Sequence, residues 1–139
     1  MNNLDLATQY RAYLDCLNAR DWDALARFVH ADVQHNGRAF GVAGYRAMLE
    51  QDVRDIPDLR FTIGLLACDP PVVSARLLFD CRPAGHFLGL PVQGRRVTFA
   101  ENVMYEFVDR LIVRVWSVVD RAAIAAQLSA DTARVEPEP

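Results

Sequence analysis

The hydrophobic pattern of the chain changes its period near Pro57. Before Pro57, apolar residues recur at helical spacing and predict a first helix over about residues 4 to 19. A second, shorter helix is expected after Asp21, which can cap it, and a third helix over about residues 42 to 55. Residues 32 to 36 are expected to form a brief strand between the second and third helices.

After Pro57, apolar and polar residues alternate, as in strands with one buried face. A first pair of strands is expected over about residues 59 to 67 and 73 to 81, and a second pair over 96 to 108 and 111 to 119. Helices followed by a mostly antiparallel sheet indicate an α+β fold, with the three N-terminal helices packed on one face of the sheet.

The C-terminal part is expected to contain one more short helix, over residues 121 to 128. Residues 129 to 139 are rich in acid and proline and have little to bury, so we expect them to be disordered. Residues 1 to 128 then form a single domain, which is a length that supports one hydrophobic core.

The last hairpin decides which side chains share a pocket. If Val108 opposes Leu111 across the turn, one face gathers most of the aromatic residues and is expected to lie under the helices. That face would carry Phe99, Glu101, Val103, Tyr105, Phe107, Ile112, Arg114, Trp116, Val118 and Asp120. The opposite face, with Met104, Val113, Val115 and Val119 beside Asn102 and Ser117, is apolar enough to predict a two-fold dimer. A one-residue bulge near the turn would break this grouping.

Composition narrows the function. The net charge is −3 and the fifteen arginines are scattered, so neither nucleic acid nor a membrane surface is an expected partner. A small molecule or another protein is the expected partner instead. No apolar run is long enough to span a bilayer, and no basic segment precedes an apolar one at the N-terminus, which predicts a soluble, cytoplasmic protein. The three cysteines, Cys16, Cys68 and Cys81, lie in apolar segments and indicate buried thiols, with no metal site.

The chain has no lysine, which removes Schiff-base chemistry and the phosphate-binding P-loop. The glycine-flanked serine of hydrolases and the glycine-rich dinucleotide turn are missing too. Acid/base chemistry by carboxylate and histidine is what remains.

Two residues are the candidates for this chemistry. Asp120 ends an apolar strand, where Trp116 and Phe99 would raise the pKa of its carboxyl and Arg114 would lower it. Asp120 also precedes the last helix and could simply cap it. His86 lies on a glycine-rich loop, and His35 on the short strand is a weaker candidate. Glu101, Arg114 and Tyr105 could line a pocket. Alternatively, Glu101 and Arg114 could form a structural ion pair with Tyr105 as its neighbour.

Several motifs occur together in the last third of the chain. They are Gly85-His86, Gly89-Leu90-Pro91, Gly94-Arg95, Tyr105-Glu106-Phe107, the Ile112–Trp116 strand, Asp120, and Gln127-Leu128. With them the chain resembles the SnoaL-like polyketide cyclases, a branch of the NTF2-like superfamily. The resemblance implies a cone of curved sheet whose concave face is covered by helices, with a hydrophobic pocket inside and a dimer formed through the outer face.

The resemblance also implies a reaction. Asp120 would act as acid/base in an intramolecular aldol closure with His86 beside it, and no metal or organic cofactor would take part. The expected substrate-binding residues are Trp116, Tyr105, Phe99, Glu101, Arg114 and His35. Two alternatives stay open: an epoxide-hydrolase-like site built from Glu101, Arg114 and Asp120, and a dimeric module that binds a small ligand without catalysis.

Overall fold

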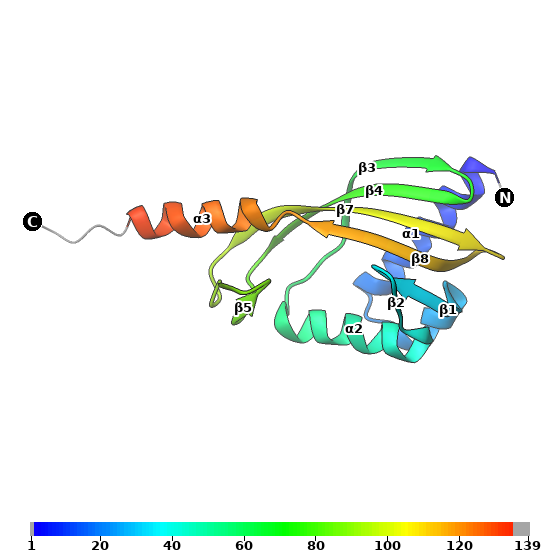
Figure 1. Cartoon of the computed structure of the whole chain (residues 1–139), viewed down its shortest axis with the longest axis horizontal. Coiled ribbons are helices and arrows are strands. Elements are labelled where there is room, and N and C mark those ends of the chain that lie inside the picture. Colours follow the sequence, from blue (N-terminus) through cyan, green and yellow to red (C-terminus); the bar gives the residue numbers. More distant parts are fainter. Residues whose placement is uncertain (1, 135–139) are drawn as a thin grey trace, which may run out of the picture.

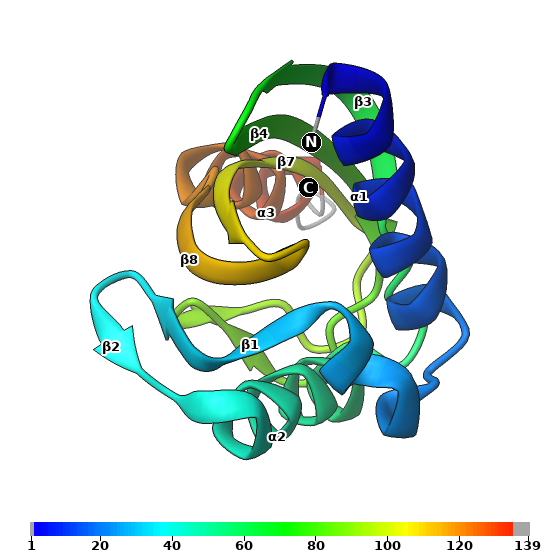
Figure 2. The same cartoon turned by 90° about the vertical axis from the view of Figure 1, so that its right-hand side faces the viewer.

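The computed structural model of the chain, which describes residues 2–134, contains a strongly curved sheet with helices packed against its concave side (Figures 1 and 2). The helical elements are α1 (Asn3–Asn18), the 3-10 helix η1 (Trp22–Arg27), α2 (Gly41–Asp55) and α3 (Arg121–Arg134). The strands are β1 (Val29–His35), β2 (Arg38–Ala39), β3 (Thr62–Asp69), β4 (Val72–Cys81), β5 (His86–Phe87), β6 (Leu90–Pro91), β7 (Val97–Val108) and β8 (Leu111–Val119).

The main sheet has six strands in the order β2-β1-β8-β7-β4-β3, and β5 and β6 form a separate hairpin. All neighbours in the main sheet are antiparallel except β1 and β8, which pair in parallel. The predicted α+β fold is confirmed: the sheet is curved but open, and α1 and α2 cover its concave side (Figure 2).

The core lies between α1 and the concave face of the sheet. Leu6, Tyr10 and Tyr13 follow the helical period on α1 and are buried, as the sequence pattern predicted. On β4 every second residue is buried, from Val73 to Cys81, because side chains alternate between the two faces of a strand. Burying one large aliphatic side chain such as Leu6 contributes about 1.5–3 kcal/mol.

The hairpin between β7 and β8 turns where expected but then departs from the predicted register. Asp109 and Arg110 both have positive φ, at 52° and 68°, as a tight two-residue hairpin turn requires. Val108 pairs with Leu111 as predicted, but Glu106 pairs with Arg114, so that β8 contains one additional residue near the turn. This β-bulge inverts the faces of the rest of β8.

Because of the bulge, the side chains that share a face differ from the predicted grouping. β7 presents Glu101, Val103 and Tyr105 to the interior as expected, but they pair with Val119, Ser117 and Val115. Arg114, Trp116 and Val118 are exposed, and Trp116 opposes Met104 across the sheet. The predicted pocket positions of Trp116 and Arg114 were therefore wrong, and so was the predicted outward position of Val115 and Val119.

A second bulge interrupts β3. The register of β3 against β4 shifts between Ile63 and Leu65. Leu65 is 68% exposed, although a strict alternation from Phe61 through Ile63 would place it on the buried face. The side chain of Leu66 turns inward instead and packs against the core. An apolar period alone does not reveal this shift, because both registers place a leucine inside.

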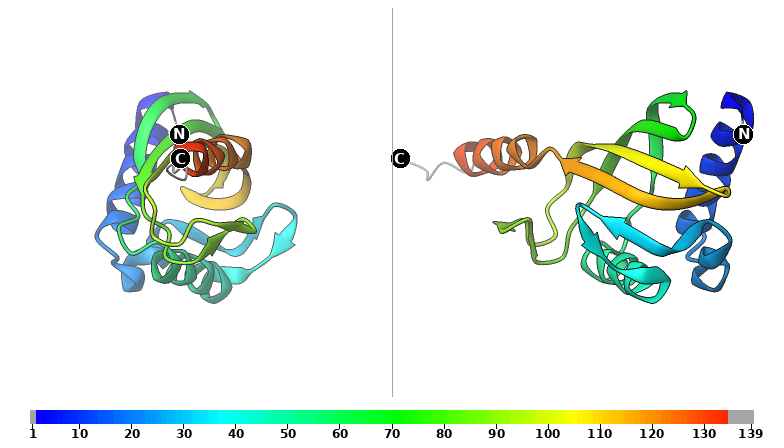
Figure 3. Two further views of the ribbon diagram at one scale, coloured as in Figure 1. Left: turned by 90° about the vertical axis from the view of Figure 1, so that its left-hand side faces the viewer. Right: turned by 45° about the vertical axis from the view of Figure 1, so that its right-hand side comes forward.

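Some element boundaries also differ from the predicted ones. β1 begins at Val29, three residues before the predicted strand, because it pairs in parallel with β8 through Val29 and Ile112. The last helix, α3, continues beyond Leu128 to Arg134 and projects past the end of the sheet (Figure 3). The predicted disordered tail is thus helical over 129–134, and 135–139 lie outside the described residues.

Candidate active site

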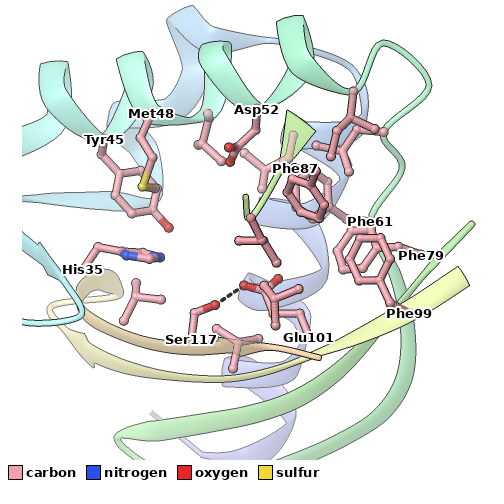
Figure 4. Close-up of a pocket in the computed structure, with 18 of the residues that line it drawn as sticks. His35, Tyr45, Met48, Asp52, Phe61, Phe79, Phe87, Phe99, Glu101 and Ser117 are labelled. Atoms are coloured by element: carbon pink, nitrogen blue, oxygen red, sulfur yellow. Dashed lines mark hydrogen bonds between the residues drawn. The ribbon is translucent and has the colours of Figure 1, made fainter. Parts of the chain in front are cut away.

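A cavity of about 220 Å³ lies between the concave face of the sheet and helices α1 and α2 and opens to the solvent (Figure 4). Ligand pockets commonly measure ~300–1,000 Å³, so this cavity suits a small molecule. Most of its wall is apolar. The lining residues are Tyr13, Leu17, His35, Tyr45, Met48, Leu49, Asp52, Ile56, Leu59, Phe61, Phe79, Phe87, Leu88, Phe99, Glu101, Val103, Tyr105, Val115, Ser117 and Val119.

Four phenylalanines gather at one end of the cavity. The rings of Phe79 and Phe99 stack with centroids 5.2 Å apart, and Phe61 meets Phe79 edge-on at 5.7 Å. Phe87, from the β5–β6 hairpin, lies 5.5 Å from Phe99. These rings form an apolar surface that favours a flat, unsaturated or aromatic group.

His35 and Tyr45 lie at the end of the cavity away from the phenylalanines, and Asp52 and Glu101 lie between the two ends (Figure 4). Glu101 projects from β7 and Ser117 from the neighbouring β8, and the Ser117 hydroxyl donates a hydrogen bond to the Glu101 carboxylate. His35 projects from β1, and Tyr45 and Asp52 project from α2 on the opposite wall.

Both carboxyl groups are held in an apolar environment. Burial raises the pKa of Glu101, and the hydrogen bond from Ser117 opposes part of that rise. Burial also raises the pKa of Asp52 to about 6, with smaller contributions from the charges of Glu101 and Asp55. No described residue that lines the cavity is an arginine, so neither carboxylate is neutralised by a cation there.

The other titratable groups in the cavity are neutral near neutral pH. Burial lowers the pKa of His35, which leaves its imidazole uncharged and able to donate or accept a hydrogen bond. Burial raises the pKa of Tyr13, Tyr45 and Tyr105. The hydroxyls of Tyr13 and Tyr45 share a hydrogen bond of 2.7 Å, which fixes Tyr45 at the cavity wall.

Four of the predicted substrate-binding residues line this cavity: Glu101, Tyr105, Phe99 and His35. Trp116 and Arg114 do not, since the bulge in β8 turns them to the outer face. Arg114 instead donates a hydrogen bond of 2.8 Å from Nη1 to Glu106. The predicted alternative of two carboxylates bridged by Arg114 is therefore not assembled in the cavity.

The two predicted catalytic residues lie outside the lining of the cavity. Asp120 is exposed, and its Oδ1 accepts a hydrogen bond of 3.1 Å from the backbone amide of Ala123 in the first turn of α3. This is the geometry of a helix cap. His86 is exposed on the β5–β6 hairpin.

Sequence reasoning missed Asp52 and Ser117. Asp52 falls on the apolar stripe of α2 with Tyr45, Leu49 and Ile56, so a carboxylate at helical spacing among apolar residues was the available signal. Ser117 gave no such signal, because only the bulge in β8 turns it inward.

Metal-binding clusters and membrane-spanning helices are both absent from the residues that the structure describes. Within residues 2–134, no three His, Cys, Asp or Glu side chains gather in a way that could hold a metal ion. None of the described helices is long and apolar enough to cross a membrane.

The curved sheet with its helix-covered concave face, and the cavity of polar and aromatic residues inside it, define a protein of the NTF2-like class. The sequence profile of the SnoaL-like polyketide cyclases matches residues 7–128. The chain therefore belongs to the SnoaL-like polyketide cyclase family, as the motifs of its last third predicted.

Solved structures agree with this assignment. A SnoaL-like polyketide cyclase from Agrobacterium tumefaciens is 52% identical with a TM-score of 0.89, and the match covers 92% of this chain and 99% of that one. TsrD from Streptomyces laurentii is 25% identical with a TM-score of 0.80, over 94% and 98% of the two chains. IdmH from Streptomyces antibioticus, at 18% identity, a TM-score of 0.76 and coverage of 89% and 98%, shows the fold alone. No curated protein matches the chain.

The hydrogen bond from the backbone amide of Ala123 to Asp120 predicts how substitutions of Asp120 change the stability of the protein. Asp120→Asn keeps an oxygen that can cap α3, so the free energy of unfolding should change by less than about 0.5 kcal/mol. Asp120→Ala removes the cap and should cost about 1 kcal/mol. Urea denaturation of the three proteins measures both values. An alanine variant as stable as the wild type would contradict the capping role.

Proposed function

We propose that the protein is an enzyme that carries out acid/base chemistry, without a cofactor, on a small hydrophobic carbonyl compound bound in the cavity. The supporting observation is the Glu101 carboxyl, which lies in an apolar cavity with a serine hydroxyl as its hydrogen-bond partner and no cation beside it among the residues that the structure describes. A carboxyl with a raised pKa exchanges protons near neutral pH, whereas an ordinary glutamate is fully ionised there.

The arrangement suits removal of a proton from the carbon next to a carbonyl group. Glu101 is the base in this proposal, and the phenylalanine end of the cavity holds the unsaturated part of the substrate. The neutral imidazole of His35 is available to donate a hydrogen bond to the carbonyl oxygen as negative charge develops on it. The resulting enol or enolate can close a ring by aldol addition or return as an isomer.

The family supports the same reaction class. The relative from Agrobacterium tumefaciens is described as a polyketide cyclase, and polyketides carry the repeated carbonyl groups that this chemistry needs. We therefore extend the substrate class of that relative to this chain as part of the proposal. Binding of a small ligand without turnover is the competing function, which the same cavity could perform.

Hydrogen–deuterium exchange tests the proposal without knowledge of the natural substrate. The protein should accelerate exchange of the methyl protons of acetophenone in D₂O, followed by proton NMR. Glu101→Gln should slow the catalysed exchange by at least ~10²-fold, because an amide cannot carry the proton. Glu106→Gln makes the same change on the outer side of β7, where Glu106 pairs with Arg114, and should leave exchange unchanged.

Two outcomes of this experiment would count against the proposal. Exchange no faster than in buffer would favour the binding function. Loss of exchange in Asp120→Asn but not in Glu101→Gln would instead assign the base to Asp120, as the family resemblance implied.

We also propose that the protein forms a homodimer through the convex face of the sheet. An outer patch of Leu78, Met104, Trp116 and Val118 is exposed there, with Val118 69% exposed and Trp116 41%. Apolar side chains clustered on one sheet face mark an interaction surface. Light scattering at micromolar concentration should give the mass of a dimer, and Met104→Glu should shift it toward the monomer. A monomeric wild type would contradict the dimer.

A further inference from the structure

Asp52 is the cavity residue that the proposed reaction has not yet used. It projects from α2 into the cavity from the wall opposite Glu101, so that the two carboxyl groups face the space between them (Figure 4). Among the described residues, no side chain or backbone amide donates a hydrogen bond to the Asp52 carboxylate, and no cation pairs with it. A partly buried carboxyl without a partner is costly unless it carries a proton or meets a ligand.

The groups around Asp52 do not offset its charge. Asp55, one turn further along α2, is itself acidic and accepts a hydrogen bond of 2.9 Å from Gln51. Arg54 faces away and donates to Gln51 at 2.7 Å. His35 on β1, Tyr13 on α1 and the other cavity tyrosines are neutral, so Glu101 on β7 is the charged group that faces Asp52 across the cavity.

We propose that Asp52 and Glu101 form a pair that holds one proton, with Asp52 as the acid and Glu101 as the base on opposite sides of the substrate. This inference rests on the proposed function and adds to it a second catalytic residue. It also narrows the substrate to an uncharged carbonyl compound, because a free carboxylate would meet a negative charge in the cavity.

The proton balance explains why a pair suits this cavity. Glu101 takes the proton from the carbon next to the carbonyl, and the electrons of the broken C–H bond form the carbon–carbon double bond of the enol. The electrons of the C=O double bond take the proton of Asp52 and form the O–H bond. One carboxyl is ionised before the step and one after it, so no additional charge appears in the apolar interior.

The electrostatics of the two groups agree with this arrangement. The charge of Glu101 contributes to the raised pKa of Asp52, which lies at about 6. Two carboxyls that interact in this way lose their protons in separate steps, and over the interval between those steps the pair holds a single proton.

Carbon-13 NMR of the side-chain carboxyls tests the pairing independently of any reaction. Titration of the wild type should show Asp52 near pH 6, and Glu101→Gln should lower the pKa of Asp52 because its charged neighbour is gone. Asp52→Asn should leave the pKa of Glu101 nearly unchanged, because Asp52 still carries its proton in the pair when Glu101 ionises. Asp55→Asn makes the same change on α2 outside the cavity and should lower the pKa of Asp52 less than Glu101→Gln does, because the charge of Asp55 makes the smaller contribution. If Glu101→Gln leaves the Asp52 titration unchanged, the pair does not exist.

The acetophenone exchange then tests the role of Asp52 as the acid. In the wild type the exchange rate should fall at low pH, where Glu101 is protonated, and at high pH, where Asp52 has lost its proton. Asp52→Asn should slow exchange by ~10²-fold or more and remove the fall at high pH, because the amide has no proton to lose. A circular dichroism spectrum and thermal melt check that the variant is folded.

The outcomes separate this inference from the proposed function. Full exchange activity in Asp52→Asn with the fall at high pH retained, beside an inactive Glu101→Gln, would overturn the pair but keep Glu101 as the base. Absence of exchange in the wild type would overturn the catalytic role of both residues, whatever the titration shows.

Discussion

Two carboxyl groups held in an apolar cavity without a cation are the constraint on which the site depends. Transferring a carboxylate out of water is unfavourable, and the groups respond with raised pKa values. The chain has fifteen arginines, yet none of the described ones lines the cavity. The packing of α1 and α2 on the sheet supplies the stability that keeps Glu101 and Asp52 in this unfavourable environment.

The bulge in β8 determines this environment. Without it, Arg114 would point to the same face as Glu101, and its guanidinium would lower the pKa of the glutamate into the ordinary range. With it, Arg114 lies on the outer face and pairs with Glu106, while Ser117 turns inward and donates a hydrogen bond to Glu101. Because β8 contains one additional residue, the hydroxyl of Ser117 lies beside the proposed base and the guanidinium of Arg114 does not.

The sequence predicts those parts of the structure that depend on local periodicity. The alternation along β4 and β7 places Phe99, Glu101 and Tyr105 inside, and the structure agrees. Trp116 was misplaced because a bulge depends on the pairing of two strands, which no single run of residues displays. Asp52 was overlooked although it lies on the apolar stripe of α2, because only the folded structure brings it to the same cavity as Glu101 of β7, a strand distant in sequence. The resemblance gave the family correctly.

The pH dependence of stability measures the central constraint directly. Because folding raises the pKa of Asp52 to about 6 and also raises that of Glu101, the unfolded chain ionises first as the pH rises, and the folded state loses relative stability. The double variant Asp52→Asn/Glu101→Gln cannot ionise at either position. Its free energy of unfolding, relative to that of the wild type, should therefore increase from about pH 4 to above the folded-state pKa of Asp52 and then stay level.

Urea denaturation of both proteins across this pH range gives the comparison. The account predicts that the advantage of the double variant is largest at neutral pH and shrinks as both carboxyls become protonated. A difference that stays constant with pH would show that folding leaves both pKa values unchanged, and a difference that favours the wild type more strongly at neutral pH would show that folding stabilises the carboxylates. Either result would contradict the account.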